Sequence, residues 1–258
     1  MVGASPVGES IRVVFFDVGG TLLHPYPSFT ARLAEVCQLH GLPVTPEQSA
    51  AAEPAVWASI SRRVDAGRGF SLSAERSRAF WLWVYEVFLT ELGYAAAARG
   101  ELPSLLLGTF MRTDTYALYA DVRPVIDTLA SAGFRLGVIS NWEGWLERLM
   151  AELDVARCFH AMSVSGLLGV EKPDPAIFHH ALEEIGVRPE HAIHVGDNPR
   201  DDVEGAEAVG IRGILLDRAN RAAPVMPGAE QAVGSLQDGR RIVSLEELPG
   251  LLGLPLGS

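Results

Sequence analysis

The sequence predicts an α/β fold, a doubly wound parallel sheet with an inserted α-helical domain. Short β-branched and aromatic runs alternate with helical patterns, once near the N-terminus and again between residues 123 and 217. Strands that alternate with helices indicate a parallel sheet covered on both faces. After the first strand, residues 25–119 contain helical patterns and no convincing strand. A segment of that length is too long for a crossover loop, so it predicts a helical domain of its own.

The first predicted strand is Ile11–Phe16, an apolar run that ends at Asp17 and a Gly-Gly turn. Four similar runs predict further strands, at Phe134–Ser140, about Ala161–Ser165, His191–Gly196 and Ile211–Asp217. Helical patterns separate them, at Arg123–Ala132, Trp142–Leu153, Pro175–Ile185 and Pro199–Val209. Proline in a first helical turn and glycine after a last turn support these limits.

The insert contains four predicted helices, at Phe29–His40, Pro46–Val64, Ala74–Leu92 and Pro103–Thr115. We therefore expect a core made of residues 1–24 and 120–258, and a helical domain made of residues 25–119. The tail from residue 219 is richer in Gly and Pro, with one short helix predicted near Leu245–Leu252.

Composition excludes several classes of protein. The chain has 258 residues and a net charge of −11, which argues against a general binder of nucleic acid or anionic membranes. Cys37 and Cys158 are too few for a disulfide framework. The first ten residues lack a signal-peptide pattern, and no run approaches the roughly 18 apolar residues of a membrane span. We expect a cytoplasmic protein the size of an enzyme.

Lys172 is the only lysine among the 21 Lys and Arg residues. It lies in the sequence Glu171-Lys172-Pro173-Asp174-Pro175. Lysine carries a compact ammonium on a flexible stem, whereas arginine carries a wide planar fork. A pocket with closely spaced anions therefore accepts lysine more easily. The alternative is that Lys172 is a residual surface lysine.

Polar residues follow the predicted strands at the sheet edge where ligands bind in such folds. These residues are Asp17, Ser140 with Asn141, and Asp197, and the loop that carries Lys172 can reach the same edge. Clustered carboxylates need a counter-charge, and Mg²⁺ is the natural one for oxygen ligands. Asp17 could then act as a nucleophile. Ser140 and Lys172 would hold phosphoryl oxygens.

These residues resemble four motifs of the haloacid dehalogenase superfamily of phosphohydrolases, in order and over roughly residues 11–217. In chain order they are Asp17-Val18-Gly19-Gly20-Thr21, Ser140 in Gly137-Val138-Ile139-Ser140-Asn141, Lys172-Pro173-Asp174, and Gly196-Asp197 with Asp202. Asp201 is an alternative for the last acid. The resemblance implies a Rossmann-like core and a subfamily I helical cap, inserted after the first motif, that closes over the site and selects the substrate.

The resemblance also implies roles for the residues of these motifs. Asp17 would be the nucleophile that forms an aspartyl-phosphate, with Ser140 and Lys172 binding the phosphoryl group of a small phosphorylated substrate. Gly20 and Asn141 would contribute to substrate binding. Mg²⁺ would be held by Asp17, the Gly19 carbonyl and Asp197, with Asp202 in support.

Gly19 departs from the family pattern, because phosphatases of the family place a second Asp there as general acid and base. Such assistance is worth about 10²–10⁴-fold, so substrates with good leaving groups, such as aryl or acyl phosphates, should be favoured. Two alternatives remain open: a phosphate-ligand binder or regulatory protein with impaired turnover, and a dehalogenase-like hydrolase of C–X bonds. A phosphonate-cleaving reaction through a Schiff base is excluded, because it needs a second lysine.

The remaining candidates have both a functional and a structural interpretation. His24 could replace the missing acid, or it is a solvated or capping histidine. His191 and His194 alternate on a predicted buried strand, which favours packing. Trp142 could form a wall of the site.

Two groups of insert residues also have both interpretations. Arg62, Arg63 and Arg68 could meet an anionic group of the substrate, or form a solvated face. An aromatic group is expected to pack the core of the insert, and its members are Trp81, Trp83, Tyr85 and Phe88.

Overall fold

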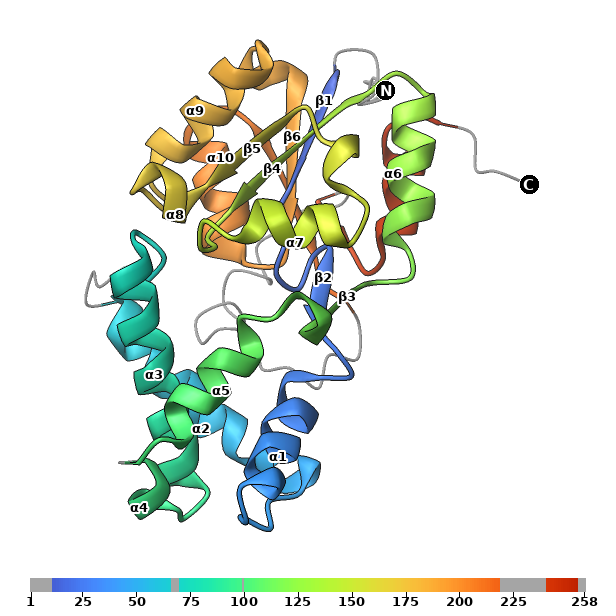
Figure 1. Cartoon of the computed structure of the whole chain (residues 1–258). Helices are drawn as coiled ribbons and strands as arrows, with labels where there is room; N and C mark the ends of the chain where they lie inside the picture. The colour runs from blue at the N-terminus through green and yellow to red at the C-terminus, as the bar shows by residue number, and fades with distance from the viewer. Residues whose placement is uncertain (1–10, 66–69, 99, 219–239, 255–258) are drawn as a thin grey trace.

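The computed structural model describes residues 11–65, 70–98, 100–218 and 240–254 (Figure 1). Two bodies are visible, a sheet with helices on both of its faces and a group of helices below it. A short two-stranded ribbon joins them. None of the described helices is both long enough and apolar enough to cross a membrane.

The main sheet of the described residues has six parallel strands in the order β5-β4-β1-β6-β7-β8. Their bounds are β1 Val13–Phe16, β4 Arg135–Ser140, β5 Ala161–Val164, β6 Ala192–Gly196, β7 Arg212–Leu216 and β8 Arg241–Ile242. The predicted doubly wound, Rossmann-like α/β core is thereby confirmed. Because β1 lies between β4 and β6, the residues that follow these three strands meet at one edge.

Strand β1 shows why this chain forms a sheet covered on both faces. Its four residues are fully buried, and alternate side chains point to opposite faces. Val14 and Phe16 belong to one hydrophobic cluster, and Val13 and Phe15 to another. The strand therefore reads as a continuous apolar run, as expected for a parallel sheet between helical layers.

The helices of the core divide between these two clusters. Residues of α6 (Val122–Ser131), α7 (Leu146–Glu152) and α12 (Leu248–Leu251) pack with Val14 and Phe16. Residues of α9 (Pro175–Ile185) and α10 (Gly205–Ala208) pack with Val13 and Phe15. The π-helix η5 (Pro199–Glu204) leads into α10, and α8 (Ser165–Leu168) follows β5.

The helical insert has a hydrophobic core of its own. Its helices are α1 Phe29–Leu39, α2 Pro46–Asp65, α3 Ala74–Glu91, α4 Ala95–Ala98 and α5 Leu102–Phe110. Buried residues such as Leu33, Val56 and Phe88 form a cluster separate from those of the sheet. Serine side chains cap the first turns of α1 and α3, where backbone N–H groups lack helical partners.

Two short strands join the insert to the core, although the sequence predicts no strand between residues 25 and 119. Strands β2 (Leu23–Pro25) and β3 (Tyr116–Leu118) pair antiparallel across the predicted domain limits. Three residues are too few to show an alternating pattern. The predicted helix at Pro103–Thr115 ends at Phe110, and a 3-10 turn at Thr113–Thr115 leads into β3.

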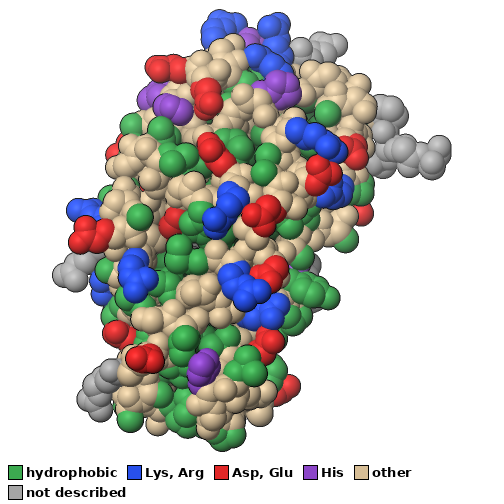
Figure 2. Space-filling view, viewed as in Figure 1, with side chains coloured by type: hydrophobic (Ala, Val, Ile, Leu, Met, Phe, Trp, Pro, Cys, Tyr) green, Lys and Arg blue, Asp and Glu red, His purple; other side chains and the backbone are tan. Residues whose placement is uncertain are grey.

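Other predicted helices differ at their ends. The one expected at Trp142–Leu153 begins only at Leu146, because residues 142–145 form a loop at the sheet edge. Near the C-terminus, a 3-10 turn at Leu245–Glu247 and α12 occupy the predicted short helix, while residues 219–239 lie outside the described part. On the face seen in Figure 2, acidic and basic side chains are interspersed and no continuous basic stripe crosses it.

Candidate active site

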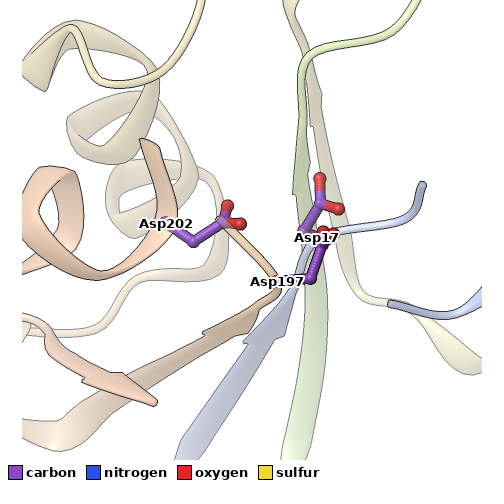
Figure 3. A group of neighbouring side chains, drawn as sticks. All are labelled: Asp17, Asp197 and Asp202. Carbon is purple, nitrogen blue, oxygen red and sulfur yellow. The ribbon is translucent and has the colours of Figure 1, made fainter. Parts of the chain in front are cut away.

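Three aspartates meet at the carboxyl edge of the sheet (Figure 3). Asp17 follows β1, Asp197 follows β6 and Asp202 lies in η5. Each contributes one carboxylate oxygen to a group whose oxygens all lie within 4.8 Å of one another. Asp17 is 7% exposed and Asp202 is 1% exposed. Because β1 and β6 are neighbours in the sheet, carboxylates that are far apart in the sequence come together at this edge.

Lys172 lies in this group and is buried. Its Nζ donates to Asp17 Oδ1 at 2.8 Å, to Asp202 Oδ1 at 2.5 Å and to the Ile139 carbonyl at 2.8 Å. An ammonium has three N–H bonds, so its hydrogen-bonding capacity is filled. The alternative of a residual surface lysine is therefore wrong.

The pKa values of these groups follow from burial and from one another. Burial alone would lower the pKa of Lys172, but the carboxylates of Asp17 and Asp202 outweigh it and raise that pKa. Burial opposes ionisation of Asp202, yet the Lys172 ammonium and the His194 hydrogen bond lower its pKa. Burial raises the pKa of Asp17 against the pull of Lys172. Additional positive charge at this edge would hold Asp17 ionised.

Ser140 and Asn141 follow β4 at the same edge. The hydroxyl of Ser140 donates to Asp17 Oδ1 at 3.2 Å. The side-chain amide of Asn141 donates to the Lys172 carbonyl at 2.9 Å and accepts from the Lys172 N–H at 2.7 Å. Asn141 therefore holds the backbone of the lysine loop, while Ser140 reaches the carboxylate of Asp17.

The position of Asp202 depends on Gly196. A Cβ at residue 196 would lie 2.1 Å from Asp202 Cγ, so only glycine lets the carboxylate pack against the end of β6. The other oxygen, Asp202 Oδ2, accepts the Asn198 N–H at 2.9 Å. Asp202 thus packs closely on the strand that delivers Asp197.

His194 is a site residue that the sequence did not reveal, since packing was predicted for it. It is fully buried, and its Nε2 lies 3.0 Å from Asp202 Oδ1. Burial lowers the pKa of His194, so the neutral ring donates from Nε2 to the carboxylate. The spacing of two residues between His194 and Gly196 was a signal for this contact. It places both residues on one face of β6, and Gly196 faces Asp202. His191 lies outside the strand, in a 3-10 turn.

The geometry distinguishes Asp202 from Asp201. Asp201 accepts from Asn198 Nδ2 at 3.2 Å and is not in the group of three carboxylates. Burial, with the neighbouring charge of Asp202, raises the pKa of Asp201 to about 7. Between the two acids, Asp202 is the one that lies beside Asp17 and Asp197.

The turn after Asp17 contains Gly19, Gly20 and Thr21. Gly20 has φ 77°, a left-handed conformation that favours glycine, and its N–H donates to the Leu23 carbonyl. Thr21 is fully buried and its hydroxyl donates to Asp197 Oδ1 at 3.4 Å. The turn is thereby tied to the end of β6.

Gly19 lies against Trp142, which was predicted to form a wall of the site. A Cβ at position 19 would come within 3.1 Å of the indole Cζ3 atom. This spacing is tighter than ordinary van der Waals contact, so a larger residue at position 19 requires the ring to shift. The place of the family's second Asp is therefore bordered by an aromatic ring.

The structure does not bring the other candidates to the carboxylates. His24 lies on β2, with Nδ1 2.9 Å from the Pro25 carbonyl and its ring centroid 4.5 Å from that of Tyr119. Arg62 donates to Ser59 on its own helix. Arg63 lies over the Trp83 ring at 4.4 Å, and Arg68 lies outside the described residues.

The insert contacts the core through Glu143, three residues after Ser140. Glu143 Oε1 accepts from the Ser77 hydroxyl and from Trp81 Nε1, the latter at 3.0 Å. Both donors lie on α3. The predicted packing role of Trp81 is thus joined by a polar one at the boundary between insert and core.

A second carboxylate makes a similar contact beside Lys172. Glu171 Oε2 accepts from the Ser71 N–H at 3.1 Å and from its hydroxyl at 2.8 Å. Ser71 belongs to the insert and is fully buried. The loops that carry Ser140 and Lys172 are therefore both hydrogen-bonded to the insert, which nothing in the sequence pattern indicated.

The donor set fits a hard divalent cation. All three clustered side chains offer carboxylate oxygens, which Mg²⁺ prefers. The group has three carboxylates, and one ammonium pairs with two of them, so ionisation of all three leaves two negative charges uncompensated. A divalent cation supplies that balance, because a bound ion is the largest local charge in such a site.

Comparison with known proteins identifies the class to which this fold and site belong. Residues 11–210 match the family model of haloacid dehalogenase-like hydrolases. The chain therefore belongs to this family of hydrolases, as its four motifs suggested.

Curated relatives include phosphatases. The chain is 32% identical over 153 residues to phosphoserine phosphatase of Thermus thermophilus, a match that covers 59% of this chain and 61% of the relative. It is 30% identical over 221 residues to glyceraldehyde 3-phosphate phosphatase of Methanothermobacter thermautotrophicus, covering 80% and 86%. It is also 28% identical to haloacid dehalogenase-like hydrolase domain-containing protein 3 of Danio rerio, covering 81% and 86%.

Solved structures share the fold. The magnesium-bound HAD-hydrolase YfnB of Bacillus subtilis superposes with a TM-score of 0.75 at 19% identity, covering 95% of this chain and all of that one. A 2-haloacid dehalogenase of Pseudomonas syringae is 26% identical with a TM-score of 0.58, covering 94% and 98%.

Proposed function

We propose that this protein is a Mg²⁺-dependent phosphatase of a small phosphorylated compound, acting through an aspartyl-phosphate on Asp17. The observation that carries the proposal is the contact of Asp17 with both Lys172 and Ser140, beside two further carboxylates. The phosphatases among the relatives support the same class of substrate. A cytoplasmic location is part of the proposal.

In this proposal, a carboxylate oxygen of Asp17 attacks phosphorus, the P–O bond to the leaving group breaks and the leaving group departs. Water then hydrolyses the resulting acyl phosphate, which releases inorganic phosphate and restores the Asp17 carboxylate. Lys172 and Ser140, both hydrogen-bonded to Asp17, would hold the phosphoryl oxygens by exchanging these hydrogen bonds for ones to the substrate. Asn141 keeps the lysine loop in place, and Gly20 gives the turn close backbone approach to the substrate.

Asp17, the Gly19 carbonyl and Asp197 would hold Mg²⁺. Asp202 would support the site, since its oxygens already accept from Lys172, His194 and Asn198. The cation supplies charge neutralisation for the phosphoryl group and for the clustered carboxylates.

Residues 25–119 would act as a cap that closes over the site and selects the substrate. The hydrogen bonds of Ser71, Ser77 and Trp81 to the core support this role, because they join the insert to the loops of Lys172 and Ser140. In a closed arrangement, the cap would shield the carboxylate edge from bulk water and leave room for the water that hydrolyses the acyl phosphate.

Gly19 sets the expected preference among substrates. With no carboxylic acid to protonate the leaving group, substrates with good leaving groups, such as aryl and acyl phosphates, should react faster than alkyl phosphates. Comparable rates on aryl and simple alkyl phosphates would contradict this preference.

The test is release of inorganic phosphate from a panel of aryl, acyl and alkyl phosphates with Mg²⁺. Wild type should be active, Asp17→Asn should lose activity and chelator should abolish it. Asp127→Asn, on the exposed face of α6, is the matched control and should behave as wild type. Activity that survives in Asp17→Asn would overturn the proposal.

Two other functions predict different results, and measurements of phosphate binding and of halide release beside this panel would test them. A phosphate-ligand binder is favoured by the loss of the acid at Gly19, and would bind phosphate while releasing none from any substrate. A dehalogenase is favoured by the 26% identical 2-haloacid dehalogenase, and would release halide from 2-haloacids with no dependence on chelator.

A further inference from the structure

We propose that Arg218, two residues after β7, is a positioning residue for the cap and for the metal-binding edge. Its guanidinium holds the segment that leads from the core into the helical insert and the segment that returns from it. Through Thr21 it also orients Asp197. The part that concerns the metal rests on the proposed function. The part that concerns the ribbon of β2 and β3 does not.

Arg218 makes a two-pronged ion pair with Asp121. Nη1 donates to Asp121 Oδ2 at 2.8 Å, and Nη2 donates to Asp121 Oδ1 at 3.0 Å. The side chains are 13% and 9% exposed. A paired fork of this kind is stronger and more directional than a single charged hydrogen bond. Asp121 immediately precedes α6, so the pair fixes the segment that returns from the insert.

The same guanidinium fixes the segment that leaves the core. Arg218 Nη2 donates to the Thr21 carbonyl at 2.7 Å, just before β2. Its Cζ also lies 3.8 Å from the centroid of the Tyr119 ring, just after β3. Tyr119 in turn donates its N–H to the Leu22 carbonyl at 3.1 Å. One side chain therefore joins both ends of the ribbon at its base in the core.

Thr21 connects Arg218 to the carboxylates. Its carbonyl accepts from Arg218, and its hydroxyl donates to Asp197 Oδ1. Thr21 is fully buried, so a shift of its backbone moves the hydroxyl with it. Partners behind a metal ligand typically change metal affinity by about 10–100-fold when they are lost. Arg218 contacts Thr21 and does not contact Asp197 itself. Its loss should therefore change metal affinity by a factor near the lower end of this range.

Asp121 is held independently of Arg218. Its Oδ2 also accepts from the Ser244 hydroxyl and from the Leu245 N–H, each at 3.0 Å. The carboxylate therefore stays in place when Arg218 is changed. Lysine at position 218 would keep one charge and one contact, but a point ammonium cannot form the fork, stack on Tyr119 and reach Thr21 together.

The experiment uses the full chain with Arg218→Lys, and Arg240→Lys as the matched control. Arg240 pairs with Glu207 in an exposed ion pair. Mg²⁺ binding is measured by calorimetry, and hydrogen exchange is measured at the Tyr119 and Tyr26 N–H groups, which bond within the ribbon segment. Arg218→Lys should weaken Mg²⁺ binding by about tenfold and speed exchange at both amides, with exchange in β1 and β6 unchanged.

Each outcome decides something. If wild type binds no Mg²⁺, the proposed function fails, while ribbon exchange still tests the role of Arg218 at the base of the insert. If Arg218→Lys matches Arg240→Lys in both measurements, the present proposal is overturned. If Arg218→Lys does not fold, Asp121→Asn breaks the same fork, and unchanged ribbon exchange in that variant overturns the proposal equally.

Discussion

The benzo edge of the Trp142 indole lies against Gly19, where a Cβ would come within 3.1 Å of Cζ3. The Trp142 ring thus borders the space that a side chain at position 19 would occupy. Inserting bulk into a packed position forces neighbouring side chains to move. An acid at position 19 is therefore expected to need a smaller residue at position 142.

This relationship predicts the result of restoring the acid. Gly19→Asp alone should give little gain on alkyl phosphates, because the indole restricts the new carboxyl. Gly19→Asp with Trp142→Leu should raise the rate by about 10²-fold over Gly19→Asp, the lower end of general acid assistance. The measurement is phosphate release, with Trp142→Leu alone as control. An equal gain in the single and double variants would show that the ring is no obstacle.

Asp202 should be a large contributor to stability and Asp201 should not. Asp202 accepts hydrogen bonds from buried Lys172 and His194. Removing one partner of a buried ion pair costs about 3–5 kcal/mol, so Asp202→Asn should lower the free energy of unfolding by that amount. Asp201→Asn is the matched control, since burial already raises the pKa of Asp201 to about 7. Urea unfolding with chelator present measures both, and similar losses would contradict this assignment.

Glu143 and Glu171 should control how firmly the insert is held on the core. Each carboxylate accepts two hydrogen bonds from the insert, and a charged acceptor is stronger than a neutral one. Glu171→Gln should favour opening by on the order of 1 kcal/mol. The readout is faster hydrogen exchange at the Ser71 N–H, which donates to Glu171.

The same reasoning applies to Glu143→Gln, with the protection of the α3 amides against exchange as the readout. Glu147→Gln, exposed on α7, is the control for a lost charge. If Glu171→Gln and Glu143→Gln exchange as the control and wild type do, these carboxylates do not hold the insert.

Glu53 should make the insert less stable at higher pH. It lies on α2 with 7% of its surface exposed, and burial raises its pKa to about 7 from an ordinary 4.5. Between pH 4.5 and 7, the folded protein binds this proton more tightly than the unfolded chain does. Its contribution to stability therefore falls as pH rises through that window.

Glu53→Gln removes this ionisation while conserving shape. The variant should unfold at a higher temperature than wild type at pH 8, and the difference should shrink below pH 4.5. Glu47→Gln, exposed on the same helix, is the control and should show no such gain. A pH-independent difference between Glu53→Gln and wild type would contradict the prediction.

Much of the fold could be predicted because its determinants are local. The apolar run before Asp17 indicates a buried strand whatever surrounds it, and its repetition with helices indicates a parallel sheet. The strand ends then identify the edge where Asp17, Ser140 and Asp197 gather. Lys172 stood out by being the one lysine in the chain.

These predictions fail where a sequence pattern is too short, or where neighbouring residues are too alike to be distinguished. The three-residue strands β2 and β3 carry no alternation, so the ribbon was missed. Adjacent Asp201 and Asp202 have the same local sequence properties, and only tertiary contacts, such as the approach of Asp202 to Gly196 and its hydrogen bonds with Lys172 and His194, separate them. His194 has the apolar neighbours of a packing residue, and its hydrogen bond to Asp202 exists only once η5 is folded against β6.

The sequence by itself determined the family, the order of the elements and the residues at the sheet edge, because these depend on neighbouring residues and on motifs. Only the tertiary structure decided how the edge is held. Thr21 and Arg218 are 197 positions apart, and Trp142 meets Gly19 across β1 and β4. Such contacts depend on side-chain packing between distant segments, which no local pattern records.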